Sequence, residues 1–206
     1  MRLVIFGATG TLGRHLVPFA LAQGHRVTAF ARRPETLELE HPALHRRAGD
    51  VLDREAVARA VAGQDAAIVA LGAGLRGRLR APGTRNVVDA MHAAGVSRLI
   101  VLSTLGAGDS ARHLDFFWKY VMFGGLLRRA MADHEAQEAI VRASGLAWTL
   151  VRPAAFTDAP ASGPIRHGDL DGAPLALKQP RSEVARFMLE QLTDDRYLHA
   201  APALSC

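Results

Sequence analysis

A glycine-rich turn near the N-terminus constrains the fold of this chain more than any other feature. Glycines recur at every third position in Gly7-Ala8-Thr9-Gly10-Thr11-Leu12-Gly13, directly after the apolar run Leu3-Val4-Ile5-Phe6. The apolar run is typical of a strand buried on both faces. Residues 14–23 then read as a helix that Gly24 ends. A strand, a glycine turn and a helix in this order predict a phosphate-binding unit, because the helix N-terminus presents amide donors to an anion.

Each glycine of this turn has its own predicted role. Gly7 allows the tight turn, Gly10 lets the backbone approach a pyrophosphate, and Gly13 lets the helix pack closely on the strand. Thr9, Thr11 and Leu12 complete the loop, and we expect them to contact the same cofactor. A purely structural glycine turn is the alternative.

The rest of the chain alternates between the two kinds of element. Strands are expected at residues 26–31, 44–48, 66–71, 99–102 and 148–151, and helices at 54–61, 82–94, within 113–143 and at 182–192. Asp53 and Ser182 are the expected caps of two of these helices. With 49% hydrophobic and 22% charged residues, the chain has a globular composition. The fold class is therefore α/β, a Rossmann-like doubly wound parallel sheet in a single domain over residues 1–206, with residues 154–206 adding a small substrate-side cap.

The end of the second strand indicates which dinucleotide is bound. An NAD-binding protein places an acidic residue there to hold the ribose hydroxyls, whereas this chain has Arg32-Arg33. Guanidinium groups suit a 2′-phosphate. We therefore expect NADP(H) to be preferred over NAD(H), with Arg32 as the first candidate and an ordinary solvated role open for the other arginine.

The glycine spacing, together with Phe6-Gly7-Ala8-Thr9-Gly10, resembles the extended and atypical branches of the short-chain dehydrogenase/reductase superfamily. The resemblance implies that further strand ends contribute to the cofactor site. In it, Asp50 and Val51 would flank the adenine, Leu71, Gly72 and Ala73 would pass under the pyrophosphate and ribose, and Ser103 and Thr104 would lie near the nicotinamide. Pro153, after the sixth strand, is a further expected cofactor-binding residue.

The superfamily's usual catalytic motif, Tyr-x-x-x-Lys, is missing. The chain contains Tyr120 and Tyr197, neither of them four residues before a lysine, and Ala130 and His134 stand where the motif would lie. Reduction of a ketone needs a positioned proton donor. A flavin, quinone or biliverdin-like acceptor needs mainly an oriented nicotinamide and a flat pocket, since its anion is delocalised.

The chain is also similar over most of its length to the flavin reductase/biliverdin-IXβ reductase family. The matching segments are residues 6–10, Gly49-Asp50-Val51-Leu52, residues 61–66, Asp133-His134, Arg142-Ala143-Ser144-Gly145-Leu146 and residues 186–189. The family implies a monomer that binds NADPH and has a shallow, open site. Its serine after the fifth strand falls on Thr104, beside Ser103. Its active-site histidine falls on Ala154, which argues against biliverdin itself as the acceptor.

Ser103, Thr104 and His134 are the candidate catalytic residues. His134 and Glu138 are one helical turn apart and are able to pair, either as a proton relay or as a surface pair that fixes the helix. No spacing supplies a third metal ligand, so no metal is expected. The aromatic segment within residues 113–125 is expected either to line a pocket, to pack in the core or to form a partner surface.

Charge and composition exclude several classes. The net charge of +5 comes from scattered arginines without interleaved aromatics, so nucleic-acid binding is not expected. No apolar run approaches a membrane span, and the single Cys206 cannot form an internal disulfide. We expect a cytoplasmic enzyme with a small planar acceptor. A non-catalytic NADP(H)-binding redox sensor is the alternative, and a sugar-nucleotide epimerase fits less well, because it usually needs the Tyr–Lys pair and a larger C-terminal domain.

Overall fold

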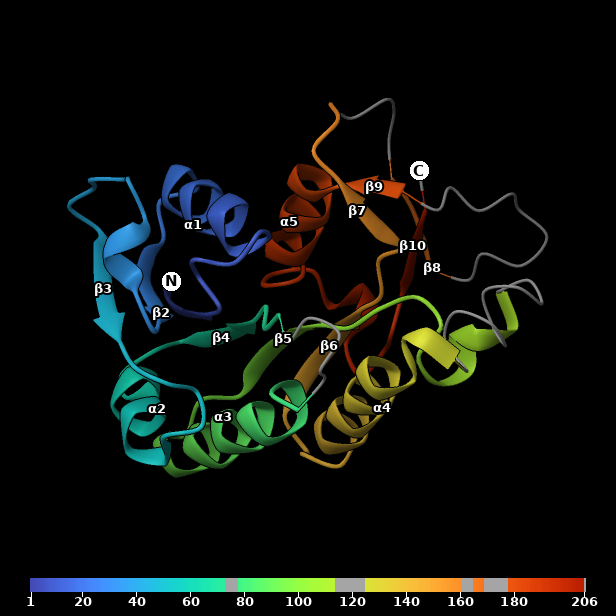
Figure 1. The fold of residues 1–206 in the computed structure, drawn as a ribbon. Coiled ribbons are helices and arrows are strands. Elements are labelled where there is room, and N and C mark those ends of the chain that lie inside the picture. Colours follow the sequence, from blue (N-terminus) through green and yellow to red (C-terminus); the bar gives the residue numbers. More distant parts are fainter. Residues whose placement is uncertain (73–77, 114–124, 161–164, 169–177, 206) are drawn as a thin grey trace.

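A central parallel sheet organises the molecule (Figure 1). The structure is a computed structural model and describes residues 1–72, 78–113, 125–160, 165–168 and 178–205. The six strands of the sheet stand in the order β3-β2-β1-β4-β5-β6 and pair in parallel throughout. Their bounds are Arg2–Phe6 for β1, Arg26–Ala31 for β2, Leu44–Ala48 for β3, Ala66–Val69 for β4, Arg98–Leu102 for β5 and Ala147–Val151 for β6.

Helices cover both faces of this sheet, which confirms the doubly wound α/β architecture. Figure 1 shows α1 (Gly13–Ala22) and α5 (Arg181–Glu190) together on one face, and α2 (Arg54–Val61), α3 (Arg80–Ala94) and α4 (Arg128–Arg142) on the other. Within the described residues, short 3-10 helices occur at Pro34–Thr36, Gly108–His113 and Asp195–Tyr197. None of the described helices is both long and apolar enough to cross a membrane.

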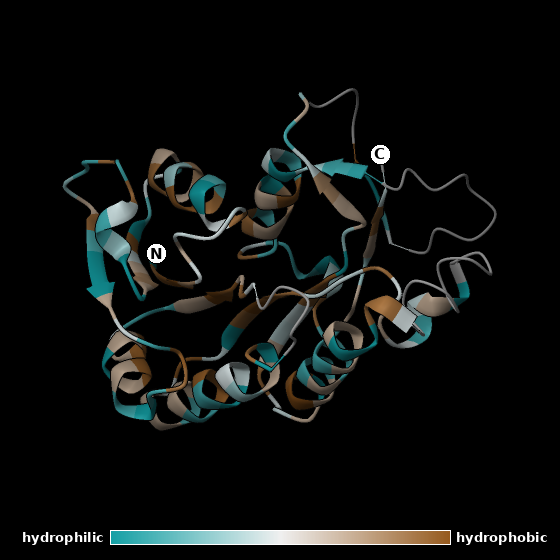
Figure 2. Cartoon of the chain, viewed as in Figure 1, coloured by the Kyte–Doolittle hydropathy of each residue, from teal (hydrophilic) through white to brown (hydrophobic). Residues whose placement is uncertain are grey.

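The inner strands β1, β4 and β5 are buried on both faces because each face meets helices, whereas the edge strand β3 is polar and partly exposed. On β1, Leu3 and Ile5 belong to the core cluster under α1 and α5, while Val4 and Phe6 belong to the cluster under α2 and α3. Figure 2 shows apolar residues along the central strands, while the edge strand β3 is largely hydrophilic. Burial on both faces explains why the strands lack the alternation of half-exposed ones.

The strand order also fixes where a ligand binds. β1 lies between β2 and β4. The chain adds β2 and β3 on one side of β1 and then crosses to add β4, β5 and β6 on the other side. In open parallel sheets a crevice forms at such a reversal, outside the carboxyl ends of the strands. The turn that follows Phe6 lies at this crevice.

Of the two helix caps expected from the sequence, one is confirmed and the other is wrong. Asp53 caps α2 as expected, accepting from the amides of Glu55 and Ala56 at 3.0 and 3.1 Å. Ser182 is not a cap, because α5 already begins at Arg181: Pro180 precedes it with a φ of −58°, close to the helical value.

Four short strands lie in stretches where no strand was expected. They are β7 (Ala155–Thr157) and β9 (Lys178–Pro180), which pair with each other, and β8 (Arg166–Gly168) and β10 (Ala203–Ser205), which form the second pair. Three residues are too few to give a periodic pattern. The aromatic run of residues 116–123 lies outside the described residues. Within residues 154–206, α5 belongs to the main core and packs against α1.

Candidate functional site

The glycine turn is held by backbone hydrogen bonds and close contacts. Gly7 has a φ of +84° and its amide donates to the carbonyl of Phe30 at 3.1 Å. A Cβ on Gly7 would lie 2.4 Å from the carbonyl oxygen of Ala70, and a Cβ on Gly13 would lie 2.2 Å from that of Gly7. Neither position tolerates a side chain, so these two glycines serve the turn and the packing of α1 on β1.

Gly10 differs from its two neighbours in the motif. A Cβ there would approach the carbonyl of Gly7 only to 3.0 Å, and Gly10 lines the hollow in front of the turn. Among the described residues, the amides of Thr11 and Leu12 have no backbone acceptor. No side chain caps α1 either. Free amides beside a helix N-terminus suit a phosphate, so the turn has the donors and the open space that a pyrophosphate needs.

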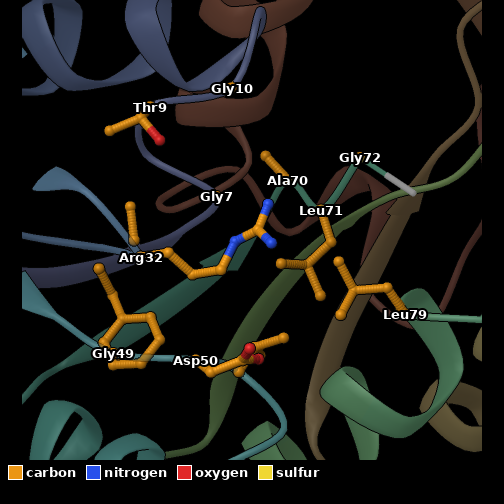
Figure 3. A pocket seen from close by; sticks show the side chains of 13 residues that line it. Gly7, Thr9, Gly10, Arg32, Gly49, Asp50, Ala70, Leu71, Gly72 and Leu79 are labelled. Atoms are coloured by element: carbon orange, nitrogen blue, oxygen red, sulfur yellow. The ribbon is translucent and has the colours of Figure 1, made fainter. Parts of the chain in front are cut away.

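A first pocket extends from this turn along the ends of β2, β3 and β4. Figure 3 shows the Arg32 guanidinium reaching across it toward Ala70 and Leu71, with Asp50 on the opposite wall from Thr9. The lining residues are Gly7, Thr9, Gly10, Phe30, Ala31, Arg32, Gly49, Asp50, Val51, Ala70, Leu71, Gly72 and Leu79. Eight of the residues predicted to bind cofactor therefore share one pocket.

The carboxylate of Asp50 has a local partner. Its Oδ1 accepts from the amide of Leu52 at 2.9 Å, while Asn86 donates to the carbonyl of Val51 at 2.9 Å. These bonds hold the loop after β3 against α3. Arg33 and Gly13 line neither this pocket nor the next one, and Ala73 lies outside the described residues.

A second cavity, of about 310 Å³, adjoins the first and shares Gly10 and Ala70–Gly72 with it. We call it the acceptor cavity. Its remaining lining residues are Thr11, Leu12, Arg80, Leu102, Ser103, Thr104, His134, Pro153, Ala154, Ala155 and Phe156. All three candidate catalytic residues therefore lie around one space, next to the glycine turn. Sequence reasoning missed Arg80, although it belongs to the arginine cluster of residues 76–80.

The hydroxyl of Ser103 is held from behind by a buried ionic network. It donates to Oε1 of Glu138 at 2.6 Å. Arg152 donates two hydrogen bonds to the same carboxylate, from Nε at 2.8 Å and from Nη2 at 2.6 Å. Its Nη1 donates to Asp109 at 2.8 Å. The Arg152 side chain is 2% exposed and that of Glu138 is 5% exposed. Because its proton is committed to Glu138, Ser103 faces the cavity as a hydrogen-bond acceptor.

This network corrects the expected pairing of His134 with Glu138. Both side chains are buried, so they do not form a surface pair, and Glu138 binds Ser103 and Arg152 instead. Spacing along a helix says only that two side chains share a face. Here the hydrogen-bond partners of Glu138 are Ser103 and Arg152, which directly follow β5 and β6.

His134 lies in the wall of the acceptor cavity without a partner for Nδ1. Burial lowers its pKa to about 3, the positive charge of Arg80 adds to this, and Asp133 opposes it. The imidazole is therefore neutral at physiological pH. A neutral ring is able to donate one hydrogen bond and accept another, but it carries no spare proton for general acid catalysis.

The depressed pKa of His134 predicts an acid-sensitive fold. The unfolded chain takes up a proton near the ordinary value of 6.5 and the folded chain only near 3, so stability is full above pH 6.5 and declines as the pH falls toward 3. Between pH 7 and pH 5 we expect His134 to account for about 2 kcal/mol of this loss. Urea unfolding at both pH values should show a smaller decline for His134→Asn. Exposed His45→Asn should behave as wild type, and equal declines in all three proteins would contradict the prediction.

The described residues contain no group of three or more His, Cys, Asp or Glu side chains placed to hold a metal ion. The polar groups that line the two pockets are backbone amides, the guanidinium groups of Arg32 and Arg80, hydroxyls, the imidazole of His134 and the carboxylate of Asp50. This composition suits an anionic organic cofactor beside a second, smaller ligand.

Comparison with known proteins agrees with this geometry. Residues 7–195 match the profile of a family described as NAD(P)H-binding. A (4-alkanoyl-5-oxo-2,5-dihydrofuran-3-yl)methyl phosphate reductase from Streptomyces griseus is 32% identical over 213 aligned positions, which cover 98% of this chain and 67% of that protein. The chain spans 52% and 67% of the length of the first two curated relatives that it matches.

Two solved structures show the same fold. An anaerobillin reductase from Escherichia coli O157:H7 superposes with a TM-score of 0.81 at 23% identity, covering 100% of this chain and 97% of that one. A wide-type short-chain dehydrogenase/reductase from Veillonella parvula, solved in complex with NADP, superposes with a TM-score of 0.85 at 16% identity, covering 100% and 94%.

Proposed function

The chain belongs to the NAD(P)H-binding family, and we propose that it is an NADPH-dependent reductase of flat, conjugated acceptors, with flavins and quinones as the first candidates. The observation that carries this proposal is the acceptor cavity, which opens beside the glycine turn and has no tyrosine among its described lining residues. Bound NADPH would supply a hydride, and the reduced acceptor would take its proton from water. A delocalised acceptor anion makes a positioned acid unnecessary.

The residues of this chain divide the work between the two pockets. The amides of Thr11 and Leu12 would bind the pyrophosphate, and Arg32 would bind a 2′-phosphate. Ser103 would orient a donor group, such as a carboxamide, because Glu138 fixes its hydroxyl. Leu102, Pro153 and the segment 154–156 supply apolar lining against which a ring would stack.

A relative supports the choice of a conjugated acceptor. The Streptomyces griseus protein is named for the reduction of an oxo-dihydrofuran, which is an unsaturated lactone rather than a simple ketone. The proposal extends this chemistry to the present chain as a class, without a specific substrate.

An acceptor panel tests the proposal directly. NADPH oxidation is followed with FMN, riboflavin, a naphthoquinone, biliverdin and, for contrast, simple aliphatic ketones. We expect turnover with flavins or quinones and none with the ketones. Tight NADPH binding without turnover of any acceptor would refute the reductase and leave the redox sensor as the better hypothesis.

Cofactor preference depends on Arg32. Arg32→Ala should weaken NADPH binding by about 1–3 kcal/mol, the scale of a charge-assisted contact, and leave NADH binding unchanged. Calorimetric titration with both dinucleotides measures this. Arg33→Ala is the matched control, because Arg33 is also exposed but lines neither pocket. Equal affinity of the wild-type protein for the two dinucleotides would contradict the preference.

A further inference from the structure

Arg80 brings a buried positive charge into the acceptor cavity. It is the first residue of α3, and its side chain is only 11% exposed. Its Nε and Nη1 have no hydrogen-bond partner. A buried donor without an acceptor destabilises a fold, and a charged donor does so more strongly. Both nitrogens are closed to solvent, and Arg80 lines the acceptor cavity, so a ligand oxygen there would supply the missing acceptor once the guanidinium turns toward it.

Asp133 does not fill that role. Its Oδ2 lies 3.6 Å from Nη1 of Arg80, too far for a hydrogen bond. Both of its oxygens already accept from the first amides of α3, those of Leu79, Arg80 and Ala81, at 3.3, 3.0 and 3.1 Å. Asp133 therefore caps α3 and balances the charge of Arg80 only partly, leaving Nε and Nη1 of the guanidinium without a hydrogen-bond acceptor.

His134 stands next to this charge in the same cavity wall. It is 8% exposed, and its Nδ1 is a second buried nitrogen without a partner. The ring is uncharged, so it adds a hydrogen-bonding site without repelling the guanidinium. Arg80 of α3 and His134 of α4 thus line the same cavity, and each has at least one nitrogen without a hydrogen-bond partner.

We propose that Arg80 and His134 form an oxyanion site for the acceptor, so that the preferred acceptors carry a phosphate, sulfonate or carboxylate group. This inference rests on the proposed reductase function. Thr11 and Leu12, the proposed pyrophosphate donors, line the same cavity. We assign Arg80 and His134 to the acceptor because they come from α3 and α4, whereas those amides belong to the glycine turn before α1. No residue of α4 lines the first pocket, whose lining also excludes Arg80.

FMN and riboflavin test the site, since they share one ring system and differ by a phosphate. With Arg80→Gln, kcat/KM for FMN should fall about 10- to 100-fold, the size of a hydrogen bond to a charged group, whereas the value for riboflavin should change less than about threefold. The dissociation constant of NADPH should stay within about twofold. Arg85→Gln is the matched control, because Arg85 is an exposed arginine of the same helix outside both cavities.

Binding measurements keep this inference separable from the reductase proposal. Flavin fluorescence is titrated with protein saturated with NADP⁺, which requires no turnover. Tighter binding of FMN than of riboflavin by wild type, lost in Arg80→Gln, would support the site even if neither flavin is reduced. Equal binding of the two flavins by wild type, including no binding of either, would overturn it. A loss of NADPH affinity in Arg80→Gln would reassign Arg80 to the cofactor. If that variant does not fold, Arg80→Lys, which keeps the charge and loses the planar fork, should reduce the preference for FMN.

Discussion

Gly10→Val is expected to lower NADPH affinity at least about 100-fold, or about 2.7 kcal/mol, while the protein stays folded. Gly10 lines both cavities, and the valine side chain would fill the space where a pyrophosphate meets the backbone. The new Cβ would press on the carbonyl of Gly7 at 3.0 Å, a contact that a shift of a few tenths of an ångström relieves. Calorimetry gives the affinity, and circular dichroism gives the state of the fold.

Two other substitutions in the turn and in α1 serve as controls for Gly10→Val. Ala22→Val enlarges an exposed residue at the end of α1 and should change neither quantity. Gly13→Ala should lose stability instead, because its Cβ would lie 2.2 and 2.5 Å from the carbonyl oxygens of Gly7 and Ala8. Unchanged NADPH affinity in folded Gly10→Val would place the dinucleotide elsewhere. Gly10→Ala provides a milder version should the valine variant be unstable.

Glu138→Gln is expected to destabilise the fold by about 3–5 kcal/mol, the usual cost of removing one partner of a buried ion pair. Burial by itself would lower the pKa of Arg152, and the hydrogen bonds and charges of Glu138 and Asp109 raise it instead. Without the carboxylate, the guanidinium would keep only the exposed Asp109 as a charged partner in contact. Urea unfolding at neutral pH measures the loss.

Two further variants show whether the ion pair is the cause. Glu135→Gln, on the exposed side of the same helix, should change stability by less than about 0.5 kcal/mol. The double variant Glu138→Leu with Arg152→Met should recover much of the stability, since it leaves no buried charge unpaired. A loss below about 1 kcal/mol in Glu138→Gln would show that the network contributes little.

Local patterns predicted the scaffold, and they predicted residues that the structure brings together in the first pocket. The turn from Gly7 to Gly13 lies between β1 and α1 as expected, and Arg32 and Asp50 line the pocket in front of it. These features depend on neighbouring residues and on one rule for parallel sheets, that strand ends share an edge. Whether this pocket takes NADPH remains a prediction for the titrations above.

Short elements and side-chain partners were not predictable in this way. The three-residue strands β7 to β10 carry too little pattern, and the start of α5 depended on Pro180 rather than on the expected cap Ser182.

The sequence by itself determined the order of the elements, the turn chemistry of the glycines and the edge of the sheet that a ligand would use. Only the tertiary structure decided which distant groups meet there. Glu138 turned to Ser103 and Arg152 rather than to His134, and Arg80 reached the same cavity as His134 from a different helix. Periodicity and spacing act over a few residues, whereas these contacts join residues 14 to 54 positions apart, which only the packing of α3 and α4 against β5 and β6 brings together.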